Sequence, residues 1–239
     1  MAARGRGSKR MQLPEEVATY VRELIISGAV RPGEFLRMER IAEALGVSNT
    51  PVREGLLTLR SEGFVRLEPR RGFVVAPFTQ QDIRDLFWAQ AELGSELAAR
   101  AAMNMTPERL RVFEKNLEDY DRAIASDDKA AIAKIGHQFH REVNLAADSH
   151  RLALLQGAVV RHLPNRFYAT IEGQVAGARA EHPMIVEAFR RGDARRARSL
   201  MAVHILEGAD RLIDTLEKQG LWDPEGAEPA SGTSPSRVS

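Results

Sequence analysis

The sequence predicts a mostly α-helical protein in two parts: three helices followed by a small β-hairpin, and then a bundle of about six helices. Apolar residues recur at helical spacing up to residue 61, and two short alternating runs follow. After Pro77 the strand signals stop, and capped helical segments continue to residue 221. We therefore expect one domain over residues 11–78 and a second over residues 79–222.

The first part begins with three predicted helices. Apolar residues at helical spacing indicate the first over 13–29, which ends in the turn Arg31-Pro-Gly33. Residues 37–45 indicate a short helix that stops at Gly46, and Ser48 then suits the N-cap of a third helix. A helix, a tight turn and a capped second helix form a helix-turn-helix, whose second helix lies in the DNA major groove.

A β-hairpin is predicted directly after these helices. The alternating runs Phe64–Glu68 and Gly72–Ala76 are joined by Pro69-Arg-Arg-Gly72. A hairpin in this position is the wing of a winged helix-turn-helix, so the order of elements indicates a DNA-binding domain.

The second part is predicted to be all helical. Thr106-Pro-Glu and Ser126-Asp-Asp are strong helix starts, and Gly192 separates the last two helices. We expect helices from Thr79 or Gln80 to about Met103, from Thr106, from Ser126 to about Ala147, and near 150–170, 174–191 and 193–221.

Composition limits the classes of protein that fit. The chain of 239 residues has no cysteine, which excludes disulfides and thiolate metal sites and fits a reducing cytoplasm. No apolar run approaches the roughly 20 residues of a membrane span, so we expect no membrane contact. Residues 1–10 form a basic arm without an apolar signal core, and residues 223–239 a tail rich in Pro, Gly and Ser; we expect both to be disordered and the protein to be cytoplasmic.

Charge is distributed unevenly along the chain. Residues 1–78 hold 13 basic and 9 acidic side chains, and residues 79–239 hold 21 and 24. The positive excess lies in the half with the predicted helix-turn-helix, as phosphate binding requires.

The start of the second helix of the motif carries the candidate base contacts. Asn49, Thr50 and Arg53 should face base edges, and arginine favours guanine. Any single arginine is equally well explained as a solvated surface charge, but the order of cap, turn, helix and wing favours DNA. The remaining candidates, which cap the helix or flank it at phosphates, are Arg37, Arg40, Ser48, Arg70, Arg71 and Gly72.

Two motifs in this region match a known family. Gly46-Val-Ser-Asn-Thr-Pro-Val-Arg-Glu54 and Leu59-Arg-Ser-Glu-Gly-Phe-Val65 closely resemble the winged helix of GntR-family bacterial transcriptional regulators. The family usually carries Ser-Arg-Thr-Pro-Val-Arg-Glu-Ala-Leu, so Asn49 and Gly55 are departures. Asn49 leaves the operator sequence open, and Gly55 should cost up to about 1 kcal/mol relative to alanine.

The second part resembles the FCD ligand-binding domain of the FadR subfamily. The matching segments are Phe139-His140, Glu181-His-Pro-Met-Ile185, Arg191-Gly-Asp193 and Met201-Ala-Val-His204. The resemblance implies a homodimer on a palindromic operator, with much of the dimer contact in this domain. It also implies control by a small metabolite, more commonly as relief of repression.

Three histidines in predicted helices are candidate metal ligands. From the residues alone, we favour the interpretation of His140, His182 and His204 as separate, individually hydrogen-bonded side chains. The resemblance implies that they bind a divalent metal, with an Asp one turn before the first; neutral imidazoles suit Zn or Ni. Gly136 occupies the Asp position here. His137 could replace it, or the cavity could hold an anion without metal.

The predicted helix over 150–170 carries the candidate effector contacts Arg161, His162 and Arg166. His162 and Arg166 are four residues apart and share a face, and a bidentate arginine suits an organic acid. A helix arginine is also common at a surface or dimer contact. Relatives often have an Arg and a Glu in the first sensor helix; their equivalents here are Gln90 and Gly94, so the effector is expected to differ.

Two other functions, an enzyme and a nonspecific DNA binder, would account for parts of this pattern. Three histidines around an open metal position could serve a hydrolase or lyase. The sequence shows no acidic residue at a catalytic spacing, no nucleophile elbow and no phosphate-binding glycine loop. We therefore do not expect the protein to be an enzyme. A nonspecific architectural DNA binder would need no interior histidines and would respond to no metabolite.

Overall fold

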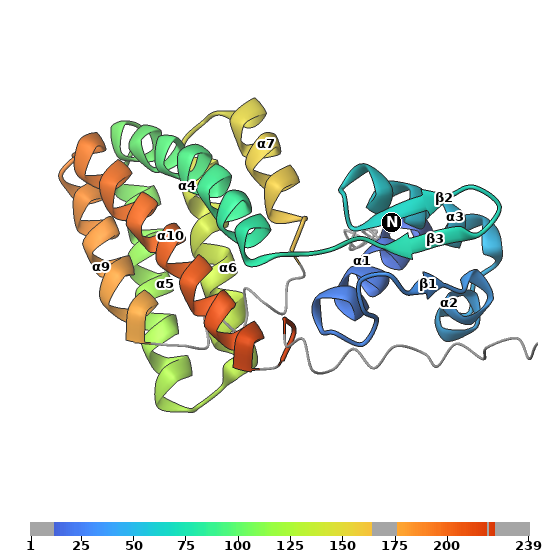
Figure 1. Cartoon of the computed structure of the whole chain (residues 1–239). Coiled ribbons are helices and arrows are strands. Elements are labelled where there is room, and N and C mark those ends of the chain that lie inside the picture. The colour runs from blue at the N-terminus through green and yellow to red at the C-terminus, as the bar shows by residue number, and fades with distance from the viewer. Residues whose placement is uncertain (1–11, 164–175, 219, 223–239) are drawn as a thin grey trace, which may run out of the picture.

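The computed structural model describes residues 12–163, 176–218 and 220–222. Figure 1 shows the two expected parts side by side, joined by the segment that leads out of the hairpin into a long helix. The expected basic arm and C-terminal tail lie outside the described residues.

The three N-terminal helices are confirmed. They are α1 (Leu13–Ile26), α2 (Met38–Leu45) and α3 (Asn49–Ser61). Gly46 ends α2 in the left-handed conformation with φ 64°, which glycine adopts without steric cost. Ser48 is the N-cap residue of α3, although its side chain makes no capping hydrogen bond.

The wing is confirmed and is part of a three-stranded antiparallel sheet. β2 (Val65–Glu68) pairs with β3 (Gly72–Val75), with Val65 opposite Val75. β1 (Phe35–Leu36), on the other side of β3, was not expected from the sequence. Two residues are too few for an alternating pattern, so only pairing with β3 defines this strand.

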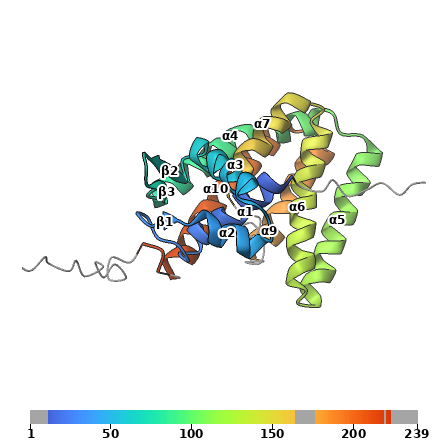
Figure 2. The same cartoon turned by 90° about the vertical axis from the view of Figure 1, so that its right-hand side faces the viewer.

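The second part is a helical bundle. Figure 2 shows α5 and α6 side by side, and α4 packs along α10. Its described helices are α4 (Gln80–Met103), α5 (Pro107–Ala125), α6 (Lys129–Ala146), α7 (His150–Val160), α9 (Ala176–Arg190) and α10 (Ala194–Lys218).

The expected helix over 150–170 is confirmed from His150 to Val160, but it ends earlier than expected. α7 ends at Val160, and residues 161–163 form a turn. Pro164 follows in the sequence, and a proline disfavours the helical conformation of the residue before it. The consequence is that Arg161 and His162 lie beyond the helix end.

Gly55 has a packing role that the sequence did not indicate. A Cβ at this position would lie 2.7 Å from both Pro14 O and Val17 Cγ1 of α1. Only glycine therefore lets α1 and α3 approach this closely, and the expected gain from alanine does not apply.

Among the described residues, two large clusters of buried side chains and a small one around Tyr120 hold the molecule together. The first extends from the winged helix into the bundle: Val17, Leu56 and Phe73 belong to the same cluster as Phe87 of α4 and Leu212 of α10. The second fills the bundle itself. Because the first cluster contains side chains of both parts, the bundle packs directly on the N-terminal helices.

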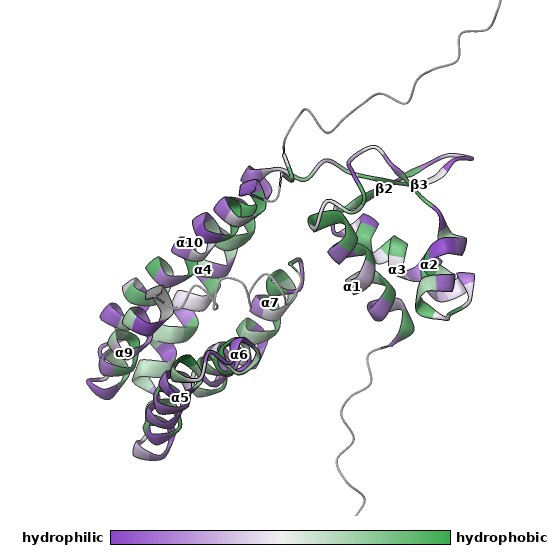
Figure 3. Cartoon of the chain, turned by 90° about the horizontal axis from the view of Figure 1, so that it is seen from below, coloured by the Kyte–Doolittle hydropathy of each residue, from purple (hydrophilic) through white to green (hydrophobic). Residues whose placement is uncertain are grey.

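Around the bundle helices, hydrophilic and hydrophobic residues alternate (Figure 3). Within the described ranges, no helix combines the length and apolar character needed to cross a membrane.

Candidate functional site

The first turns of α3 present a polar, solvent-facing surface. Asn49, Thr50 and Arg53 are exposed, while Val52 and Leu56 on the other side of the helix are fully buried. The expected base-contact residues are therefore held by a packed helix and remain free to meet a ligand. The flanking candidates are exposed as well, with Gly72 half-buried: Arg37, Arg40, Ser48, Arg70 and Arg71.

The two wing arginines differ in their surroundings. Arg71 Nη1 donates to Glu68 Oε2 at 3.2 Å, and its guanidinium lies 4.4 Å from the centre of the Phe35 ring. Arg70, at the turn with φ 64°, makes no hydrogen bond or ion pair to another described residue. Of the two guanidinium groups, that of Arg70 is the less constrained by neighbouring residues.

A buried ion pair anchors the end of α3. Arg22 of α1 is 2% exposed, and its Nε and Nη2 donate to Glu62 Oε2 at 3.2 and 2.6 Å. Glu62 is the C-cap residue of α3, the second helix of the helix-turn-helix and the expected recognition helix. The pair therefore fixes α3 to α1. Sequence reasoning missed Arg22, because a charged residue beside an amphipathic stripe is normally solvated.

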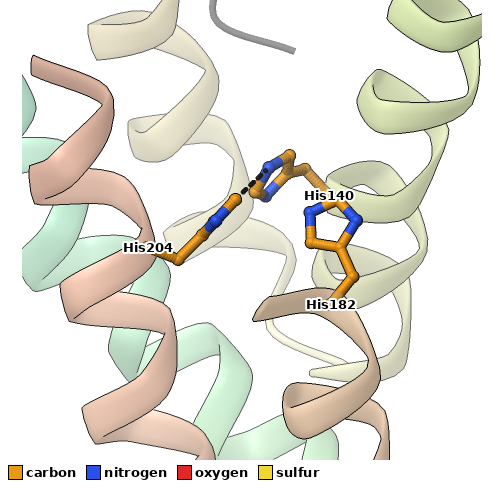
Figure 4. Close-up of side chains that lie close together, drawn as sticks. All are labelled: His140, His182 and His204. Atoms are coloured by element: carbon orange, nitrogen blue, oxygen red, sulfur yellow. Dashed lines mark hydrogen bonds between the residues drawn. The ribbon is translucent and has the colours of Figure 1, made fainter. Parts of the chain in front are cut away.

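The three candidate metal ligands converge from three helices (Figure 4). One ring nitrogen each of His140, His182 and His204 lies within 4.8 Å of the others. The Nε2 atoms of His140 and His204 are 3.2 Å apart, close to the separation of two ligands that share one tetrahedral ion at about 2.0–2.1 Å. The convergence supports a common site over three separate histidines.

His182 is suited to donate a lone pair. Its ring is buried and stacks on Phe139 at 4.0 Å, and neither ring nitrogen has a hydrogen-bond partner among the described residues. Burial lowers the pKa of His182 well below its usual value, and the neighbouring His204 and His140 lower it further. A buried neutral imidazole without partners is costly unless a ligand satisfies it.

Glu181 orients His204. His204 Nδ1 lies 2.5 Å from Glu181 Oε2, so Nδ1–H donates and Nε2 faces His140. Burial alone would raise the pKa of Glu181, but the hydrogen bond and charge of His204, with smaller contributions from Glu207 and Arg211, outweigh it and lower the pKa to about 2. A carboxylate on the outer nitrogen of a histidine is the arrangement that fixes metal ligands in proteins.

The departure at Gly136 leaves the site without a carboxylate ligand among the described residues. Gly136 is buried in α6 one turn before His140, and His137 lines the adjacent cavity without joining the cluster. Three imidazoles, of which His204 is oriented by Glu181, fit Zn or Ni.

A cavity of about 250 Å³ adjoins the histidines. Its wall combines two arginines, two of the three clustered histidines, amide side chains and apolar groups. The lining residues are Phe87, Gln90, Gly94, His137, His140, Arg141, Val143, Asn144, Gln156, Gly157, Val160, Met201, His204, Ile205, Gly208 and Arg211.

The expected effector contacts do not line this cavity. Arg161 is exposed and His162 half-buried beyond the end of α7, and Arg166 lies outside the described residues. The arginines at the cavity are Arg141 and Arg211, which sequence reasoning missed. Arg211 follows His204 by seven residues, two helical turns on the same face, and this spacing could have identified it.

Arg211 is held toward the cavity by two carboxylates. Its Nη2 donates to Glu181 Oε1 at 2.8 Å and to Glu207 Oε2 at 2.6 Å. Gln90 and Gly94, the expected equivalents of the family's Arg and Glu, do line the cavity. These two positions therefore add no charge to the cavity wall.

Two family models match the chain in the expected order. The model for bacterial regulatory proteins of the gntR family matches residues 13–75, and that of the FCD domain matches residues 85–207. The chain belongs to the gntR family of bacterial regulatory proteins. It is a DNA-binding transcriptional regulator with an FCD effector-binding domain, consistent with the FadR subfamily.

Relatives with known names support this assignment. The chain is 24% identical over 202 residues to the uncharacterized regulator YdhC of Bacillus subtilis, covering 83% of this chain and 90% of that protein. It is 39% identical over 71 residues to the gluconate operon transcriptional repressor of Bacillus licheniformis, covering 30% of this chain and 29% of that protein. The solved structure of E. coli McbR/YncC has the same fold, with a TM-score of 0.60 at 23% identity over 88% of this chain and 99% of that one.

Proposed function

We propose that this regulator is a dimeric repressor that releases a palindromic operator when an organic acid binds in the FCD cavity. One observation carries the DNA-binding part: the exposed start of α3 holds Asn49, Thr50 and Arg53 above a fully buried supporting face. As a protein that acts on bacterial DNA, it would work in the cytoplasm.

Dimerisation follows from the size of the DNA-binding surface. A single recognition helix contacts too few base pairs for useful selectivity, and two-fold dimers on two half-sites solve this problem. In the proposal the FCD domains supply much of the dimer contact, and Arg37, Arg40, Arg70 and Arg71 contact phosphates around each half-site.

We propose a divalent metal, Zn or Ni, at His140, His182 and His204. The support is the pair of unpartnered ring nitrogens of His182 and the orientation of His204 by Glu181. The metal would supply a Lewis-acid position for the carboxylate of an effector. Arg141 and Arg211 at the same cavity would add positive charge for that carboxylate.

The sign of control is proposed from a relative. The Bacillus licheniformis relative is named a transcriptional repressor. Release of DNA requires that the effector binds the DNA-incompetent state more tightly, by about 1–3 kcal/mol for typical allosteric couplings. In this proposal the metal has no catalytic role, because the relatives are named as regulators.

A binding experiment with one matched pair of variants tests the DNA-binding part. Duplexes that bind the purified protein are selected from a random pool, and affinity is measured by fluorescence anisotropy. Arg53→Ala should weaken binding at least about tenfold while leaving the circular dichroism spectrum unchanged, since a bidentate arginine contributes about 1–3 kcal/mol of discrimination. Arg60→Ala, an exposed arginine in the last turn of the same helix, is the control. Equal affinities of both variants would refute the role of Arg53.

A thermal-shift screen tests the sensor part. Small carboxylates and sugar acids are added to the protein with and without Zn²⁺ or Ni²⁺. We expect an acid to raise the midpoint only in the presence of metal, and to weaken operator binding in the same concentration range. No shift by any acid under either condition would contradict the proposed effector class.

A further inference from the structure

Helix α7 lines the cavity, and the turn that follows it contacts the winged helix. Gln156, Gly157 and Val160 of α7 line the cavity. Two residues beyond Val160, the ring of His162 lies 6.4 Å from the ring of Phe64, between centroids. Leu163 is 2% exposed and belongs to the buried cluster that contains the winged-helix core. A short piece of chain thus connects the ligand site with the DNA-binding domain.

The end of α7 lies at the anchor of the recognition helix. Phe64 also carries Arg22 above its ring at 5.8 Å, and Arg22 is paired with Glu62, the C-cap residue of α3. The charges nearest to His162 are Glu62, Arg22 and Arg161. Burial lowers the pKa of His162 most, Glu62 raises it, and the two arginines lower it. The ring is therefore uncharged near neutral pH and packs on the anchor as an aromatic side chain.

The other end of the connection is an unsatisfied polar group in the cavity wall. Gln156 is 8% exposed, and its Oε1 has no hydrogen-bond partner among the described residues. Its amide lies over Gly94 of α4, where a Cβ would be 3.4 Å from Gln156 Nε2. An unpaired buried carbonyl oxygen costs about 1–3 kcal/mol, so a ligand with an O–H or N–H group gains by donating to it.

We propose that α7 couples the two sites: the ligand donates a hydrogen bond to Gln156, and His162 and Leu163 transmit the resulting shift of α7 to the Arg22–Glu62 anchor of the recognition helix. This inference rests on the proposed function, since it explains how a ligand would control DNA binding. A packed helix moves as a unit, so a small displacement at the cavity reaches its end. The direct consequence is a changed orientation or stability of α3.

Hydrogen exchange tests the contact at the winged helix without any ligand. The full-length protein is compared with His162→Ala and with His150→Ala, which makes the same substitution at the exposed start of α7. We expect amides of residues 58–64 to exchange about fivefold faster in His162→Ala, because local opening is easier when a packed contact is lost. His150→Ala should match the wild type. Equal exchange in all three proteins would overturn the proposal.

A double-mutant cycle tests transmission from the cavity. Gln156→Ala removes the amide side chain from the α7 wall of the cavity without adding bulk. It should change exchange at residues 58–64, and the change should be lost in the His162→Ala background. An effect of equal size in both backgrounds would show a route that bypasses α7.

The two proposals fail in different ways. If the proposed function is wrong, the wild type will show no sequence-selective DNA binding. If the proposed coupling is wrong, His162→Ala will leave amide exchange at residues 58–64 unchanged, and this exchange is measured without DNA. Either result stands regardless of the other.

Discussion

The two domains place their functional side chains in opposite ways. In the winged helix, Asn49, Thr50 and Arg53 point outward from one helix whose other face is buried. In the FCD domain, His140, His182 and His204 point inward from three different helices, α6, α9 and α10. DNA is larger than the protein and needs a convex, exposed surface, whereas a small acid and a metal must be enclosed.

This difference decides how each site tolerates change. An exposed contact can be removed without loss of the fold, because few neighbours depend on it. A buried cluster combines function with packing, as the stack of Phe139 on His182 at 4.0 Å illustrates. Substitutions in the FCD site should therefore affect binding and stability together, and those on the face of α3 should affect binding alone.

The largest effect is expected at His182. His182→Ala should remove the bound metal, because two imidazoles hold a transition ion much less tightly than three, and elemental analysis after gel filtration measures this. His137→Ala is the matched control, since His137 lines the cavity but lies outside the cluster. Wild-type protein that takes up no Zn or Ni from a saturating solution would end the metal proposal.

A smaller effect is expected at Glu181, which tests whether orientation matters at the enclosed site. Glu181→Gln should weaken metal binding about 10–100-fold, the usual effect of losing the group that orients a ligating histidine. Isothermal titration with Zn²⁺ measures the affinity. Glu207→Gln is a control, because Glu207 contacts Arg211 and has no hydrogen bond to a clustered histidine among the described residues. Equal affinities of both variants would argue against the role of Glu181.

Gly55→Ala compares packing in the two domains. It should destabilise the protein by about 1–3 kcal/mol, because the added methyl group collides with the backbone of Pro14 and with Val17. Gly157→Ala in α7, where a Cβ meets only Arg161 Nη1 at 3.5 Å, should be neutral or stabilising by up to about 1 kcal/mol. Chemical denaturation measures both. If Gly55→Ala stabilises the protein, the close approach of α1 and α3 is not required.

The smallest effect concerns the junction between the domains. The pKa of His162 is lower in the folded protein than its ordinary value, so the unfolded chain binds more protons as the pH falls below about 6.5. The neutral ring of His162 therefore contributes its full stabilisation above that pH, and this stabilisation is lost as the pH falls toward the pKa of His162 in the folded protein. The thermal midpoint of the wild type should thus fall more between pH 7 and pH 5 than that of His162→Gln. If the thermal midpoints of the two proteins change equally with pH, His162 is not buried at the junction.

Local patterns were sufficient to predict the winged helix. The stop at Gly46, the cap at Ser48 and the alternation on both sides of Pro69–Gly72 each depend on neighbouring residues, so they can be recognised in one dimension. The same patterns predicted most helices of the bundle. They failed for the C-terminal end of α7, which lies four residues before Pro164, and for β1, which is defined by its partner strand.

Resemblance to the FCD domain identified the three histidines, but the cavity required the folded chain. Arg141, Gln156 and Arg211 lie on three helices, and only packing brings them to one wall. The Arg22–Glu62 pair and the close approach at Gly55 likewise join residues 40 or so positions apart. Amino-acid order specifies which residues share a helix face, because the helical repeat is local. Which faces meet depends on long-range packing, and the ligand site and its connection to the recognition helix both arise at that level.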